Sequence, residues 1–175
     1  MAQLLILDAC VTINLIASGV DLEELATPMG VRFAMTRIAA SEVLHLAPTE
    51  AGGAREQIDV FELASRGALV VVDLQGEEVA RYVQFARSVD DGEAATIAVA
   101  SCRSVDLATD DRKGRRLAQS VGVRTVGTAA LLRAWYEGGQ VGSARVARAL
   151  LLIERRASYF PSQDDPDLSW WEENR

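Results

Sequence analysis

The sequence has few of the residues that hold metals through sulfur or imidazole. Its 175 residues include two cysteines, Cys10 and Cys102, and a single histidine, His45. A structural zinc site usually takes four such ligands, so this class of site is excluded. Any metal that the protein binds must therefore be held by oxygen atoms.

Long apolar runs and targeting segments are also missing. The longest apolar runs, residues 68–72 and 149–153, are far shorter than the roughly 20 residues that span a bilayer. The N-terminus has no basic segment followed by an apolar stretch and a small-residue cleavage site. From these absences we expect a cytoplasmic protein that does not contact membranes.

Positive charge is scarce overall but concentrated in one segment. The net charge is -7, which argues against a polyanionic partner because binding to polyanions depends on basic residues. Residues 112–156, however, hold ten Lys or Arg against two acids, whereas residues 1–111 hold seven against eighteen. This division suits a basic surface beside an acidic pocket, and a solvated arginine-rich helix face remains the alternative.

The length and the 49% hydrophobic content predict one domain with one core. We assign this domain to residues 1–157. Residues 158–175 differ in character, since they carry two prolines, the pair Trp170 and Trp171, and five acidic residues. We expect an acidic C-terminal tail, either disordered or folded over the basic segment.

Short apolar strands alternate with helices along the chain. We expect strands at residues 3–7, 31–35, 68–73, 105–109 and 123–126, and helices at residues 10–17, 36–46, 50–66, 77–88, 90–102, 110–120, 128–137 and 143–156. This alternation predicts an α/β/α sandwich around a mostly parallel sheet of four or five strands. In such sheets ligands bind beyond the carboxyl ends of the strands, near the point where the strand order reverses.

Acidic residues stand where this fold would place a site. Asp8 follows the first strand, and Asp110 and Asp111 follow the strand at 105–109, so the three should emerge at one edge of the sheet. Glu42 and Glu93 fall on the apolar faces of their expected helices, where a carboxylate is costly unless something compensates it.

Each of these residues also has a purely structural explanation. The aspartates at the strand ends could cap the helices that follow, and Asp90 with Glu93 has the spacing of a capping box. A cap does not account for Glu42, although a position at the boundary of the core would tolerate it. Thr109 could orient a ligand, or it could simply end a strand, as β-branched residues do.

Taken together, the carboxylates indicate a bound cation. Two carboxylates about 5 Å apart repel by roughly 3 kcal/mol at an effective dielectric near 20, so several cannot stay ionised in one cleft unaided. No cationic residue adjoins Asp8, Glu42 or Glu93 in the sequence, although a distant arginine could reach them. Oxygen ligands favour Mg²⁺ or Mn²⁺, which can activate water and stabilise charge in phosphodiester hydrolysis.

Four motifs, in this order, resemble those of the PIN-domain family. They are Leu4-Leu5-Ile6-Leu7-Asp8, Ser41-Glu42-Val43-Leu44, Asp91-Gly92-Glu93-Ala94, and Thr109-Asp110-Asp111 followed by basic residues. Residues 123–128 are similar to the last strand and turn of one subgroup. The resemblance covers about residues 3–135 and is to the ribonuclease toxins of bacterial toxin-antitoxin pairs and their solitary relatives.

The resemblance implies a metal-dependent endoribonuclease that leaves 5′-phosphate ends on RNA. It implies that the metal is bound, and catalysis carried out, by Asp8, Glu42, Glu93 and Asp111. Asp110 is the alternative fourth ligand, because both acids of the pair could face the site, although the Thr-x-Asp pattern favours Asp111. The family also implies a homodimer and, for a toxin, an antitoxin partner.

Cys10 and the basic residues after Asp111 bear on the same resemblance. Cys10 stands where the family often has Ser, Thr or Asn, which weakens one supporting hydrogen bond. The residues expected to contact the RNA backbone lie at the end of the fourth strand and on the helix that leaves the acidic site: Thr109, Arg112, Lys113, Arg115 and Arg116. If the tail folds over this basic helix, it would compete with RNA.

Other functions fit the sequence less well. A phosphatase of the HAD type needs a second aspartate two residues after the first, where Cys10 stands. A response-regulator receiver needs a lysine on a late strand, and none follows its only candidate phosphoacceptor, Asp73. A non-catalytic PIN-fold module that binds a partner is the main alternative.

Overall fold

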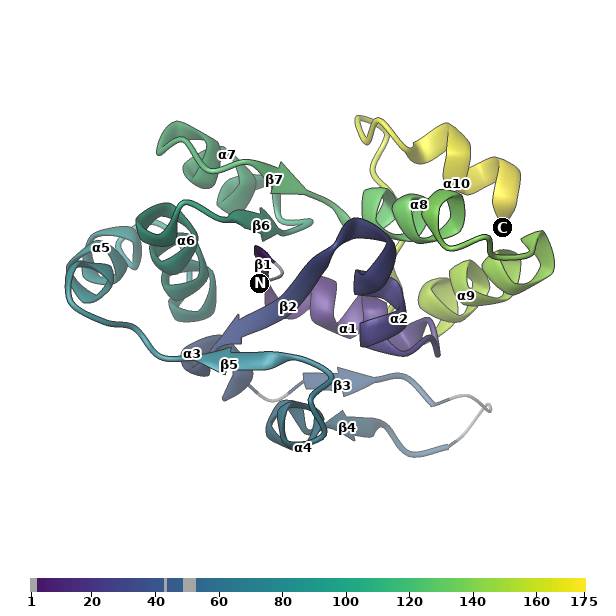
Figure 1. Cartoon of the computed structure of the whole chain (residues 1–175), viewed down its shortest axis with the longest axis horizontal. Helices are drawn as coiled ribbons and strands as arrows, with labels where there is room; N and C mark the ends of the chain where they lie inside the picture. Colours follow the sequence, from purple (N-terminus) through teal and green to yellow (C-terminus); the bar gives the residue numbers. More distant parts are fainter. Residues whose placement is uncertain (1–2, 43, 49–52) are drawn as a thin grey trace.

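The centre of the protein is a five-stranded parallel sheet, seen in a computed structural model that describes residues 3–42, 44–48 and 53–175 (Figure 1). The strands lie in the order β5-β2-β1-β6-β7, and their bounds are Val70–Val72, Val31–Thr36, Gln3–Leu7, Asp106–Ala108 and Thr125–Val126. The chain builds outward from β1 through β2 to β5, then crosses to the other side through β6. The strand order therefore reverses between β1 and β6.

Helices cover both faces of this sheet. On one face lie α1 (Ala9–Ala17), α2 (Leu22–Ala26), α8 (Thr128–Gly138) and α9 (Ser143–Arg156); on the other lie α5 (Glu77–Phe85), α6 (Asp91–Arg103) and α7 (Arg112–Ser120) (Figure 1). Successive strand residues point to opposite faces, so Leu5 and Leu7 belong to the first core and Ile6 to the second. The expected α/β/α sandwich is confirmed.

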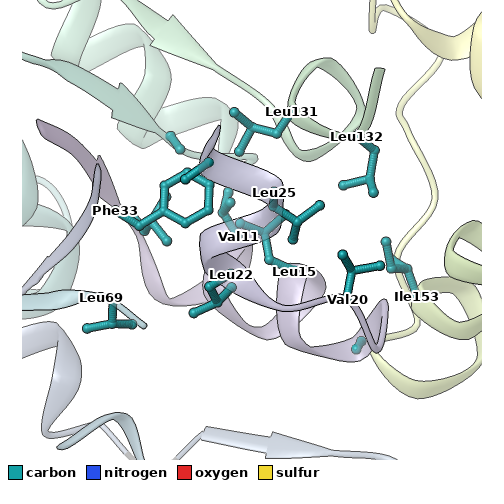
Figure 2. Close-up of a cluster of buried hydrophobic side chains, with 14 of the residues drawn as sticks. Val11, Leu15, Val20, Leu22, Leu25, Phe33, Leu69, Leu131, Leu132 and Ile153 are labelled. Atoms are coloured by element: carbon teal, nitrogen blue, oxygen red, sulfur yellow. The ribbon is translucent and has the colours of Figure 1, made fainter. Parts of the chain in front are cut away.

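The first core joins segments that are distant in the sequence. Figure 2 shows Val11 and Leu15 of α1 beside Leu25 of α2, with Phe33 of β2 and Leu131 of α8 closing around them. All five side chains are at most 2% exposed. Burying an apolar side chain of this size stabilises the fold by about 1.5–3 kcal/mol, so this core fixes α1 firmly behind Asp8.

The helix expected at residues 36–46 is wrong after its first turn. Thr36 caps α3 (Arg37–Ala40), because its hydroxyl accepts a hydrogen bond from the Ala39 backbone N–H at 3.2 Å. The chain then forms β3 (Leu44–Leu46), which pairs antiparallel with β4 (Glu56–Ile58). Leu44 and Leu46 are buried and His45 is exposed, the alternation of a strand. Val43 lies outside the described residues.

The helix expected at residues 50–66 is also wrong in its first half. Residues 50–52 lie outside the described part of the chain, and the rest divides into β4 and α4 (Val60–Ser65). Asp59 begins α4, since its carboxylate accepts a hydrogen bond from the Glu62 backbone N–H at 2.9 Å. The sequence contains this capping signal, since Asp59 and Glu62 are three residues apart.

The C-terminal segment is ordered and belongs to the first core. It ends in α10 (Leu168–Asn174), and Trp171 is fully buried against α9, where its indole N–H donates to Glu154 Oε1 at 2.9 Å. Tyr159 packs edge-on against Trp171, with 5.6 Å between ring centroids. A disordered end, one of the two alternatives from the sequence, is therefore wrong.

A short 3-10 helix, η1 (Thr27–Met29), links α2 to β2. Within the described ranges, every helix is too short or too polar to cross a membrane.

Candidate active site

The candidate site lies at the point where the strand order reverses. Leu7 of β1 is the register partner of Ala108 of β6, so Asp8 and Thr109 leave the sheet side by side. The Asp8 backbone N–H donates to the Ala108 carbonyl at 2.9 Å, and the Thr109 hydroxyl donates to Asp8 Oδ2 at 3.1 Å. The two strand ends meet at one sheet edge, as the sequence predicts.

Asp8 is buried and held by several donors at the start of α1. Its Oδ1 accepts from the Ala9 backbone N–H at 2.7 Å, as a helix cap does, and its Oδ2 accepts from Thr109 and from the Cys10 thiol at 3.2 Å. Burial raises the pKa of the Asp8 carboxyl, the three hydrogen bonds lower it in part, and nearby Asp90 raises it again. Asp8 therefore both caps α1 and belongs to the acidic cluster.

Cys10 keeps the supporting hydrogen bond in a weaker form. A thiol is a weaker donor than the hydroxyl that a serine would supply. Burial, followed by the charges of Asp8 and Asp110, raises the pKa of this thiol. The thiol therefore stays protonated and remains able to donate to Asp8.

Glu93 and Asp111 meet above Gly114 of α7. A Cβ atom at Gly114 would lie 3.4 Å from Glu93 Oε1 and 3.6 Å from Asp111 Oδ1, so both carboxylates rest on this glycine. Asp111 caps α7, with Oδ1 accepting from the Lys113 and Gly114 backbone N–H groups at 2.7 Å each. These two hydrogen bonds fix the position of the Asp111 carboxylate at the start of α7.

The environment of Glu93 is the most perturbed of the cluster. Asp90 caps α6, because its Oδ1 accepts from the Glu93 backbone N–H at 2.8 Å, and this fixes Glu93 in the first turn. Burial, then the negative charges of Asp111, Asp90 and Asp8, raise the pKa of Glu93 to about 8. A carboxyl in such a position gains free energy from any nearby cation.

Glu42 joins the cluster from a turn and not from a helix. It follows α3 on the exposed side of the molecule, which corrects the expectation of an apolar helical face. Its carboxylate nevertheless lies directly over Gly92, where a Cβ atom would stand 1.9 Å from Glu42 Oε1. Burial of the carboxyl group, then Asp90, Asp8 and Asp91, raise the pKa of Glu42.

These groups surround one open cavity of about 570 Å³. It is lined by Asp8, Ala9, Cys10, Ile13, Glu42, Leu44, Asp90, Glu93, Asp110 and Asp111. Six of the ten are acidic, and none of these six carboxylates forms an ion pair with a described Lys, Arg or His. The charge of Arg115 lowers the pKa of Asp110 without an ion pair, and the cavity keeps an excess of negative charge.

The donor set suits a hard cation, although its carboxylates stand apart from one another. In the described part of the chain, no three Asp, Glu, His or Cys side chains converge as closely as a shared metal ion requires. The Oδ1 atoms of Asp8 and Asp111 are turned toward backbone N–H groups. Mg²⁺ commonly uses one or two carboxylates and keeps several waters, so carboxylates alone fit it without a third protein ligand.

Asp110 also lines the cavity, but its carboxylate is occupied by hydrogen bonds from three other segments. Its carboxylate accepts from the Asn14 side-chain amide at 3.0 Å, from Thr128 through the backbone N–H at 2.9 Å and the hydroxyl at 2.6 Å, and from the Tyr159 hydroxyl at 3.3 Å. Burial raises the pKa of Asp110, and the bonds from Thr128 lower it in part. Asp110 thus ties α1, α8 and the C-terminal segment together.

The residues expected to contact a nucleic acid separate into two groups. Thr109 and Arg115 face inward: the Thr109 hydroxyl supports Asp8, and Arg115 Nη2 donates to the Thr109 carbonyl at 3.1 Å. Lys113 and Arg116 are exposed and form no ion pair with a described residue. Arg112 is exposed as well and pairs with Asp164 of the C-terminal segment.

A family model for DUF3368, a PIN domain, matches residues 5–163. The chain belongs to the PIN-domain family. PIN domains are generally nucleases, so the family supports a nucleic-acid-cleaving role for the acidic cavity. A comparison with curated proteins finds no match.

Three residues that line the acidic cavity or contact its acids were not predicted from the sequence. Asp90 lines the cavity with the five acids expected from the sequence, and its place in the run Asp90-Asp91-Gly92-Glu93 was a usable signal. Asn14 is 4% exposed on the mostly apolar α1, and a buried amide of this kind indicates a buried partner. Tyr159 gave no local signal, because its partner Asp110 is 49 residues away.

Proposed function

We propose that this PIN-domain protein is an endoribonuclease that hydrolyses RNA phosphodiester bonds with Mg²⁺ or Mn²⁺. The observation that carries the proposal is the pair Glu93 and Asp111, brought together beside Asp8 in an open cavity. Burial, followed by repulsion from Asp111 and the other nearby acids, raises the pKa of Glu93 to about 8. A protein keeps such a costly arrangement where it serves a site, and a divalent cation relieves it.

The residues would divide the work according to how firmly each is held. Asp8 and Asp111 are fixed by the backbone N–H groups that they cap, so they are the ligands whose positions are set in advance. Glu93 and Glu42 have freer carboxylate ends that can turn toward a cation. When bound, the cation supplies charge stabilisation at the phosphate in an in-line displacement and makes water more acidic.

Asp110, Thr109 and Arg115 would act by positioning the others. Asp110 is saturated by donors from three segments, which favours Asp111 over Asp110 as the fourth ligand. Thr109 orients the Asp8 carboxylate. We propose that the RNA backbone contacts Arg112, Lys113 and Arg116, the exposed cations of α7, whose sequence-independent attraction supplies affinity.

The first experiment compares RNA cleavage with Mg²⁺, Mn²⁺ and EDTA, using end-labelled single-stranded and structured RNA, and DNA of the same sequences. Asp8→Asn is the control, because the amide keeps the shape of the carboxylate and removes its charge. We expect cleavage that needs the metal and falls by roughly 100-fold in Asp8→Asn, as for loss of a metal ligand. Absence of cleavage across a broad RNA panel, with no metal binding by calorimetry, would instead support the non-catalytic binding module.

We also propose, from the family resemblance, a homodimer and an antitoxin partner. Val79 and Val83 lie one turn apart on α5 and are 47% and 55% exposed, which gives a small apolar surface for a protein contact. Light scattering on the purified protein tests the dimer, and a monomeric mass at micromolar concentration would reject it.

A further inference from the structure

The C-terminal segment places a carboxylate on the basic residue nearest to the acidic cavity. Asp164 forms an ion pair with Arg112, which begins α7 immediately after Asp111. Both side chains of the pair are mostly exposed, 78% for Asp164 and 64% for Arg112. The pair therefore stands in water beside the site and is not part of the core.

A second cavity continues from the acidic one along this segment. It measures about 410 Å³, shares Asp110 and Asp111 with the first cavity, and has Arg112, Tyr159 and Asp164 among its lining residues. A chain of phosphates that entered the acidic cavity and continued into this one would run past Arg112. At that point it would meet the Asp164 carboxylate.

The segment is anchored on both sides of Asp164. Before it, the Tyr159 hydroxyl donates to Asp110 Oδ1 at 3.3 Å. After it, Asp167 pairs with Arg133 of α8, with 2.9 Å between Arg133 Nη1 and Asp167 Oδ1, and Trp171 is fully buried. These anchors hold the turn that carries Asp164 against α7 even though the ion pair itself is weak.

We propose that Asp164 occupies the place on Arg112 that a phosphate of the RNA backbone takes, so that the C-terminal segment competes with substrate at the edge of the site. A guanidinium binds carboxylate and phosphate through the same planar donors, so one anion can replace the other. An exposed ion pair contributes little free energy, so RNA displaces Asp164 at a modest loss of affinity. The inference rests on the proposed function, because it names the group that limits RNA binding at that site.

The test measures the Kd for fluorescently labelled single-stranded RNA by anisotropy, in EDTA so that the RNA stays intact. Asp164→Asn is compared with Glu173→Gln, which removes one negative charge from an exposed position of α10 that has no ion pair among the described residues. We expect Asp164→Asn to bind RNA about two- to fivefold more tightly, with a dependence of log Kd on log salt that is steeper by roughly 0.7. Glu173→Gln should change Kd by less.

The Arg112→Gln variant tests whether the gain in RNA affinity of Asp164→Asn depends on Arg112. We expect Asp164→Asn to give no gain in an Arg112→Gln background, because the competing pair is already absent. Equal tightening by Asp164→Asn and Glu173→Gln, no tightening at all, or a gain that survives Arg112→Gln would each overturn the inference and leave the proposed function intact. If none of the variants bound RNA in EDTA, the inference would also fall, because there would be no binding for Asp164 to limit, whereas the cleavage assay with Mg²⁺ or Mn²⁺ decides the proposed function separately. Point substitutions are used because truncating the segment would remove the buried Trp171.

Discussion

Replacing Gly92 by alanine should lower nuclease activity without lowering stability. Gly92 lies in the first turn of α6, directly beneath Glu42, and an added Cβ atom would stand 1.9 Å from Glu42 Oε1. The other neighbour outside α6, the Ala39 Cα atom, would be at 3.6 Å, an ordinary contact. Only the end of one flexible side chain must therefore move.

The size of that movement sets the expected effect. To reach an ordinary contact of 3.4 Å from 1.9 Å, the Glu42 carboxylate must shift by about 1.5 Å away from Gly92. A misplacement of about 1 Å at a catalytic group can cost roughly 100-fold in rate, so we expect kcat/KM to fall roughly 10- to 100-fold. Alanine is better than glycine in a helix by up to about 1 kcal/mol, which raises Tm by roughly 2–4 °C in a chain of this length.

The assay pairs RNA cleavage with thermal unfolding for Gly92→Ala, Glu42→Ala and the double variant. If the loss passes through Glu42, the double variant should be no slower than Glu42→Ala alone, because the displaced group is already gone. Wild-type activity in Gly92→Ala, or losses that multiply in the double variant, would refute the reasoning. A fall in Tm of several degrees would show that Gly92 is needed for packing instead.

Two further variants separate charge from structure in the site. Glu93→Gln should stabilise the metal-free protein at pH 9 by about 1–2 kcal/mol, after allowing for partial solvent screening, and leave it nearly unchanged at pH 4. The sign follows because the pKa of Glu93 in the folded state, about 8, lies above its ordinary value of 4.5, so the wild-type protein loses stability as the pH rises from 4.5 to 8. Urea unfolding in EDTA measures the difference in stability between the variant and the wild type. A difference that does not change with pH would contradict the prediction. Asp110→Asn should lower Tm by roughly 3–10 °C. The reason is that the new amide N–H₂ would face a donor from Asn14, Thr128 or Tyr159 and leave buried groups unpaired. An unchanged Tm with lost Mg²⁺ binding, both measured by calorimetry, would make Asp110 a ligand after all.

The parts of the fold that the sequence predicts correctly are those decided by local patterns. The apolar run that ends at Asp8, the capping signal at Asp90 and the basic helix after Asp111 each lie within a few residues. Segments decided by distant pairing were missed. Leu44 to Leu46 form a strand because Ile58 and its neighbours pair with them, and nothing within residues 36–46 states that this partner exists.

Glu42 shows that membership of the acidic cluster can be predicted for the wrong reason. Its apolar neighbours in the sequence indicate the buried face of a helix, whereas it stands in a turn on the exposed side. It reaches the cluster because Gly92, in another helix, has no side chain to exclude it. The glycine of the motif Asp91-Gly92-Glu93 is therefore a position of close approach, which is a physical role that the motif alone does not reveal.

The sequence motifs left the choice between Asp110 and Asp111 open, and the alternation of the strand favours Asp111. Successive side chains of an extended chain point to opposite faces. Thr109 donates to Asp8, Asp110 binds Asn14 and Thr128 on the face of α1 and α8, and Asp111 returns to Glu93 on the face of α6. Leu107 packs in the core beneath α6, so Thr109 and Asp111, two and four residues later, lie on the same face. Ile6 packs in that core too, so Asp8, two residues after it, also lies on this face. Counting by twos from the apolar residues of each strand therefore assigns Asp111 to the acidic cluster and Asp110 to the supporting side, and this count needs only the sequence and the alternation of a strand.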